Sequence, residues 1–187
     1  MKQLVSLALA AAVLCPSAAT AEELKSGLEK GKGIGPFYVT KTAGAEDDGV
    51  AEGQNLCYRC KNGARPQVMV FTRSTDQKVV SLVQKLDEQL QKNEEAQLRA
   101  FVNMLGTSKD AAESDVKKLA VASKAKNVPF VVPNEFENGP EDYGINPKAE
   151  ITIIIANEAK VVSNHAAASA KDLDLNAVLG DLKKMLN

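Results

Sequence analysis

The stretch Pro66–Lys92 (PQVMVFTRSTDQKVVSLVQKLDEQLQK) decides the fold of this chain. Its first part, Pro66–Thr72, carries apolar residues on both faces, which is typical of a strand buried inside a sheet. Its second part, Ser74–Lys92, repeats apolar residues at helical spacing, and Ser74 or Thr75 can cap its start. A buried strand followed by a long amphipathic helix indicates an α/β protein.

The same alternation of strands and helices continues along the chain in both directions. We expect further strands at 36–42, 98–105 and 128–132, helices at 111–125 and 173–186, and a hairpin of 151–156 with 159–163 around Asn157-Glu158. This order predicts a central mixed β-sheet flanked by helices on both faces.

The N-terminus has the three parts of an export signal. Lys2 is followed by an apolar run over 4–14 that is too short to span a membrane, and Ala19-Thr20-Ala21 fits a signal peptidase site. We therefore predict a signal peptide over 1–21 and an exported protein, periplasmic or extracellular. Cys15 lies inside this signal and is expected to be lost on cleavage, without membrane insertion of the mature chain.

Composition narrows the classes of partner. The chain has 23 basic and 24 acidic residues and no tryptophan. This balance provides no basic surface for nucleic acid and no polybasic membrane patch, so we expect neither partner. No sequence motif requires a cofactor.

Cys57-Tyr58-Arg59-Cys60 holds the two cysteines that remain after cleavage. Because no third thiol is left to pair with either one, they act together or not at all. In an oxidising compartment such a pair forms a disulfide, a redox dithiol or half of a metal site.

Three short motifs and the order of elements together resemble the thioredoxin-like superfamily, nearest to its redoxin and peroxiredoxin branch. Gly35-Pro36-Phe37 is similar to the entry of redoxin domains, and Tyr143-Gly144-Ile145 resembles the segment that leads into the proline loop of the superfamily. The third motif is the C-x-x-C pair itself. The resemblance implies a thioredoxin-like domain over 36–187, preceded by a flexible lead-in over 22–35.

Two features depart from the thioredoxin pattern. The C-x-x-C of thioredoxins follows the first core strand and opens the long helix, whereas Cys57 and Cys60 precede the strand at 66–72, and the junction Thr72–Asp76 has no cysteine. No proline stands directly before the hairpin, because Pro147 comes too early. We therefore expect a displaced cysteine pair and no thioredoxin-type cis-proline.

The cysteine pair leaves two main hypotheses for function. In the first, the protein exchanges disulfides with protein thiols or with another envelope protein, and Arg59, Lys61 and Arg65 favour the thiolate. Cys57 would then attack and Cys60 would resolve. In the second, the domain is a non-enzymatic binding module with a structural disulfide. A bridge over so short a loop stabilises a fold by about 2 kcal/mol, against about 3 kcal/mol for fifteen residues.

A third hypothesis is copper handling by Cys57, Cys60 and His165. His165 is the only histidine of the chain, and two thiolates with an imidazole suit copper. Copper proteins of this superfamily use a wider cysteine spacing at the strand–helix junction, which this chain lacks. A zinc site would need a fourth ligand that is not evident.

Overall fold

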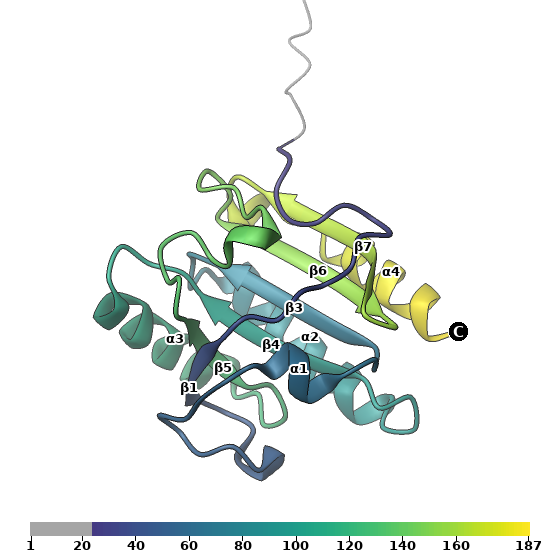
Figure 1. Ribbon diagram of the computed structural model, residues 1–187, viewed down its shortest axis with the longest axis horizontal. Helices are drawn as coiled ribbons and strands as arrows, with labels where there is room; N and C mark the ends of the chain where they lie inside the picture. Colours follow the sequence, from purple (N-terminus) through teal and green to yellow (C-terminus); the bar gives the residue numbers. More distant parts are fainter. Residues whose placement is uncertain (1–23) are drawn as a thin grey trace, which may run out of the picture.

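A computed structural model describes residues 24–187 (Figure 1). The signal peptide predicted for 1–21 lies outside the described residues. Within 24–187, no helix is both long enough and apolar enough to cross a membrane.

A seven-stranded mixed sheet organises this part of the chain, in the order β2-β1-β5-β4-β3-β6-β7. The three central strands, β3, β4 and β5, are parallel, and every outer strand is antiparallel to its neighbour. The strand bounds are β1 (Val39–Ala43), β2 (Asn55–Leu56), β3 (Gln67–Thr72), β4 (Arg99–Met104), β5 (Phe130–Pro133), β6 (Ile151–Asn157) and β7 (Lys160–Ala167). The predicted mixed sheet is confirmed.

Three long helices cover one face of this sheet: α2 (Gln77–Lys92), α3 (Lys109–Ser123) and α4 (Leu175–Leu186). The chain moves from β3 through α2 to β4, then through α3 to β5, and both steps go in the same direction across the sheet. Because crossovers between parallel strands are right-handed, two steps in one direction place both helices on the same face.

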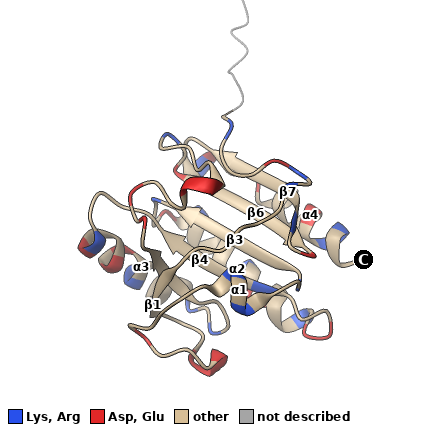
Figure 2. Cartoon of the chain, in the orientation of Figure 1, with Lys and Arg blue, Asp and Glu red and all other residues tan. Residues whose placement is uncertain are grey.

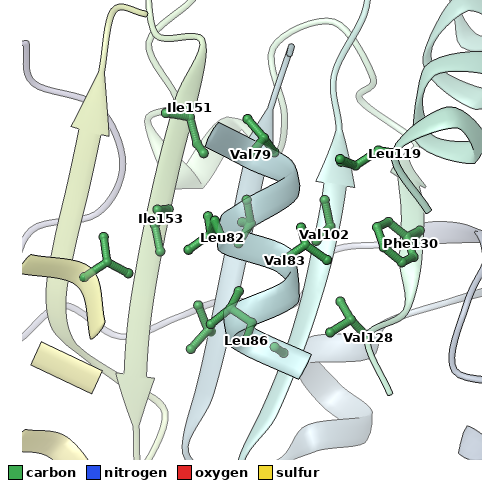
Figure 3. Packing of buried hydrophobic residues seen from close by; sticks show 14 of the residues in the cluster. Val79, Leu82, Val83, Leu86, Val102, Leu119, Val128, Phe130, Ile151 and Ile153 are labelled. Atoms are coloured by element: carbon green, nitrogen blue, oxygen red, sulfur yellow. The ribbon is translucent and has the colours of Figure 1, made fainter. Parts of the chain in front are cut away.

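The apolar repeat of α2 packs against this face, as the sequence predicts (Figure 3). Its buried side chains point toward residues of the central strands and of β6. Truncating one such core residue to alanine costs about 2–5 kcal/mol. The packed residues include Val79, Leu82, Val83 and Leu86 of α2 with Val102, Phe130 and Ile153 of the sheet.

The opposite face carries only short elements. They are α1 (Tyr58–Asn62), the single turn η2 (Glu141–Tyr143) and the segment that precedes β1. The motif similar to the redoxin entry and the motif similar to the proline-loop lead-in meet here, because the Tyr143 hydroxyl donates to the Gly35 carbonyl at 2.7 Å and its ring packs on Phe37. Helices thus lie on both faces as expected, but very unevenly.

The lead-in predicted over 22–35 lies, where it is described, along the hairpin of β6 and β7 (Figure 1). Backbone bonds join Gly31 and Lys32 to Val161, and the Asn164 side chain donates to the carbonyls of Ser26 and Leu28. This contact covers part of the free edge of β7. The flexibility expected for this segment stays a prediction.

Three local features differ from the sequence expectation. Asp76, rather than Ser74 or Thr75, caps α2 by accepting from the Lys78 backbone. The hairpin turns at Glu158-Ala159, one residue later than expected, and β7 runs on to Ala167. The sequence pattern predicts no helix at Tyr58–Asn62, where the structure has the short helix α1, capped by Cys57, whose sulfur accepts from the Cys60 backbone N–H.

The hairpin turn generates a stability prediction. Ala159 has φ of 60°, in the left-handed region that costs an alanine about 1 kcal/mol but not a glycine. Ala159→Gly should therefore raise the free energy of unfolding by about 0.5–1 kcal/mol, measured by urea denaturation. The matched control is Ala177→Gly in the exposed part of α4, which should lower it by about 1 kcal/mol. Equal effects of the two changes would contradict the assignment of strain to the turn.

Candidate functional site

The two cysteines form a disulfide at the start of α1, with Cα atoms 5.2 Å apart. Cys57 is the N-cap residue, and its sulfur accepts a hydrogen bond from the Cys60 backbone N–H at 3.1 Å. A sulfur that already accepts an N–H bond is suited to carry negative charge, because that bond favours the thiolate over the thiol.

The two cysteines differ in exposure. Cys57 is buried, with 8% of its surface accessible, whereas Cys60 is exposed. The difference arises because Tyr58 and Asn62 anchor one side of α1 in the core, so that Cys60 lies on the outer side. The Tyr58 ring stacks on Phe101 of β4 with centroids 5.6 Å apart. Cys60 is therefore the more accessible residue of the pair.

A buried lysine holds α1 in this position. The Lys41 ammonium is 2% exposed and donates to three oxygens: the carbonyls of Ala45 and Val50 at 2.8 and 2.7 Å and the Asp48 carboxylate at 2.8 Å. An ammonium has three donors, so every one is satisfied. The other oxygen of Asp48 accepts the Tyr58 hydroxyl. Tyr58, which directly follows Cys57, is thereby tied to β1.

The tyrosine of this network resists ionisation. Burial raises the pKa of the Tyr58 hydroxyl, and its hydrogen bond to Asp48 raises it further because a phenolate would face a carboxylate. Burial also raises the pKa of Tyr143 on the same face of the sheet. Both tyrosines therefore remain neutral donors in the folded protein.

Basic residues lie on the helix that carries the disulfide, and Figure 2 shows blue segments on α1. The Arg59 guanidinium donates to the Ile34 carbonyl at 2.9 Å, and that of Arg65 donates to the Gln97 side chain at 3.0 Å. Neither side chain, nor that of Lys61, joins an ion pair within residues 24–187. Their charge is available to stabilise a nearby thiolate.

The disulfide lies at the opposite end of the sheet from the strand–helix junction. Asn62 and Gly63 bond to the side chain of Gln67, the first residue of β3, whereas the junction follows Thr72, the last residue of β3. At the junction the Thr72 hydroxyl donates to backbone carbonyls and Asp76 caps α2. No peptide bond among the described residues is cis.

The structure does not bring His165 to the cysteines. His165 pairs with Ile153, whose side chain lies on the α2 and α4 face, and its Nε2 is 3.2 Å from the Asp181 carboxylate of α4. Tyr58, the neighbour of Cys57 in the chain, packs on the other face. Across residues 24–187 no three His, Cys, Asp or Glu side chains group as metal ligands, so the copper hypothesis has no cluster to support it.

Sequence reasoning missed the buried Lys41–Asp48 pair. Lys41 stands near the end of an expected strand and Asp48 in an expected acidic loop, so neither residue type suggested burial. The available signal was the tyrosine between the cysteines, since a buried hydroxyl needs a partner.

Comparisons with known proteins agree on the fold. No protein-family model and no curated protein matches the sequence. Among solved structures, the thioredoxin domain of a thiol-disulfide oxidoreductase from Bacteroides vulgatus aligns with a TM-score of 0.62 at 13% identity, covering 86% of this chain and 99% of that one. Mycobacterium tuberculosis AhpC aligns with a TM-score of 0.59 at 12% identity, covering 86% and 99%.

A third similar structure is an exposed lipoprotein thioredoxin from Streptococcus pneumoniae, with a TM-score of 0.53 at 17% identity, covering 80% of this chain and 99% of that one. Likeness at such identities establishes the class of fold. The chain has a thioredoxin-like α/β fold, and its C-x-x-C disulfide lies away from the strand–helix junction.

The buried pair generates a stability prediction. Lys41→Met should lower the free energy of unfolding by about 3 kcal/mol, because Asp48 and two carbonyls lose a buried partner. Urea denaturation of the oxidised protein measures the change. The control is Lys85→Met, which removes an exposed pair with Glu88 and should cost no more than about 0.5 kcal/mol. Equal costs would contradict the anchoring role of Lys41.

The raised pKa values of Tyr58 and Tyr143 generate a prediction for alkaline pH. Unfolded tyrosines ionise near pH 10, so stability is retained below that pH and should fall as the pH rises above it. Absorbance at 295 nm should show no phenolate from these two residues until the protein unfolds. Phenolate from all three tyrosines in a protein with intact amide protection would contradict their burial in this network.

Proposed function

We propose that this chain is an exported thiol–disulfide exchange protein that reacts through Cys57 and Cys60. The observation that carries the proposal is the asymmetry of the pair. One sulfur belongs to an exposed residue, and the other belongs to a buried residue and already accepts a backbone N–H. An accessible sulfur with a stabilised leaving group is what exchange chemistry requires.

The reaction begins with a substrate thiolate that attacks Cys60 Sγ. The Cys57–Cys60 bond breaks, the substrate sulfur bonds to Cys60, and Cys57 leaves as a thiolate next to the Cys60 N–H. A second substrate thiolate then attacks the substrate sulfur of the mixed disulfide, and Cys60 leaves as a thiolate. The substrate is oxidised to a disulfide, and the protein pair takes up the two electrons. The reverse sequence reduces a substrate disulfide.

This mechanism reverses the order expected from the sequence. The sequence predicts Cys57 as the attacking thiol and Cys60 as the resolving thiol. The exposure of the two residues supports Cys60 as the cysteine that meets the substrate and Cys57 as the one that resolves it.

Export and partners are part of the proposal. The predicted signal peptide over 1–21 supports a periplasmic or extracellular protein, where disulfides persist. Two of the similar structures are named as a thiol-disulfide oxidoreductase and an exposed thioredoxin, which fits protein thiols and disulfides as partners.

A second candidate function is a non-enzymatic binding module with a structural disulfide. It is favoured by the position of the pair, which lies at the opposite end of β3 from the junction that carries the cysteines of thioredoxins. In that case the bridge would fix α1 against the sheet and would not exchange.

Alkylation of the reduced protein tests the proposed order. Cys60 should react with iodoacetamide at least about tenfold faster than Cys57, because the Cys57 residue is buried, with mass spectrometry identifying the modified peptide. Cys57→Ser should accumulate a mixed disulfide on Cys60 when it is incubated with a cysteine peptide in both its thiol and its disulfide form, since no resolving thiol remains. Cys60→Ser should form the corresponding mixed disulfide on Cys57 at least about tenfold more slowly.

The doubly substituted protein Cys57→Ser/Cys60→Ser is the control. It should lose all exchange with a disulfide substrate while remaining folded. If the wild-type protein also fails to exchange, and the double substitution only lowers the melting temperature, the binding-module function replaces the redox function.

A further inference from the structure

A pocket of about 520 Å³ borders α1 on the side toward α2 and the start of β4. Tyr58, Lys61 and Arg65 line it from α1 and the residues that follow. Arg99 and Lys126 line it from the β4 strand and the loop before β5. The volume lies in the range of sites that hold a small molecule or a short peptide segment.

The charge of this pocket is predominantly positive. Four basic side chains line it, and none of them joins an ion pair within the described part of the chain. Of its three carboxylates, Asp48 is already neutralised by the buried Lys41. Asp47 and Glu94 remain, so the lining has an excess of two positive charges. A partly enclosed site with such an excess concentrates anionic ligands.

The pocket lies along the helix that carries the disulfide. Cys57 and Cys60 are not among its lining residues, but each is the sequence neighbour of one, Tyr58 and Lys61 respectively. Tyr58 and Asn62 line the pocket from the inner side of α1, whereas Cys60 lies on its outer side, so a ligand on the basic lining has to extend past Lys61 to reach Cys60.

We propose that this pocket binds peptide thiols and disulfides that carry carboxylates, and that it selects acidic segments as substrates of the cysteine pair. This inference rests on the proposed exchange function, because it names the substrate class of the same site. The carboxylates would pair with Lys126 and Arg99 on the far wall and with Lys61 on the near wall. The substrate sulfur then reaches Cys60 from the rim.

Two peptides of matched size separate charge from shape. The acidic probe is acetyl-Glu-Cys-Glu-amide, and the neutral probe is acetyl-Gln-Cys-Gln-amide. Second-order rate constants for reduction of the oxidised protein are compared per thiolate, because neighbouring carboxylates raise the pKa of a thiol. At low ionic strength the acidic probe should react about tenfold faster, and the difference should shrink in high salt.

Matched lysine substitutions locate the effect. Lys126→Gln removes one charge from the lining and should reduce the ratio of the acidic to the neutral rate constant at least about threefold. Lys124→Gln removes an exposed charge two residues away that does not line the pocket, and it should leave the preference unchanged. Equal effects of the two substitutions, or no preference in the wild type, would overturn the inference.

A binding measurement distinguishes failure of the pocket from failure of the redox function. The S-methylated acidic peptide cannot exchange, but it should bind the wild-type protein more tightly than its S-methylated neutral counterpart, with amide shifts around Lys61 and Lys126 in NMR spectra. Reduction by the neutral probe without this binding would overturn the pocket and keep the exchange function. Binding without reduction by any thiol would instead overturn the exchange function.

Discussion

The buried ammonium of Lys41 is the constraint on which the position of the cysteine pair depends. An unpaired charge inside a protein is so costly that its surroundings must supply oxygens in the right places. Here the loop after β1 folds back so that two of its carbonyls and Asp48 meet all three donors. Asp48 then has one oxygen left for the Tyr58 hydroxyl, and this bond fixes the residue that follows Cys57. With Tyr58 held against Phe101, Cys60 is directed outward.

The topology explains why this end of the sheet has room for such a site. Because both crossovers run in one direction, α2 and α3 lie on one face of the sheet, and α4 packs on the same face. Short elements and the lead-in cover the other face (Figure 1). A five-residue helix ahead of β3 fits on that less crowded face. The junction after β3, where thioredoxins have their cysteines, is closed here by the hydrogen bonds of Thr72 and the Asp76 cap. The fold is that of thioredoxin-like proteins, but its cysteine pair lies elsewhere.

Much of this fold follows from sequence patterns, because burial imposes periodicity on residues close together in the chain. The apolar repeat of α2, the strand β3 with both faces buried and the β6–β7 hairpin are examples. The absence of a cysteine at the junction after β3 is evident from the sequence itself. The missed features depend on distant partners. Lys41 is buried only because a loop closes around it, and the relative exposure of Cys57 and Cys60 depends on the anchoring of Tyr58. The position of His165 is also set by a distant partner, Asp181 of α4, which no local pattern indicates.

The reduction potential of the Cys57–Cys60 disulfide tests the central claim, that this displaced pair is redox-active, most directly. The native protein would be equilibrated with thiol–disulfide buffers of defined potential, and the reduced fraction quantified by alkylation and mass spectrometry. The account predicts a potential above about −300 mV, within reach of biological thiols, because the Cys60 N–H and the surrounding basic side chains stabilise the reduced pair. A potential well below that value would mark a structural bridge and contradict the account.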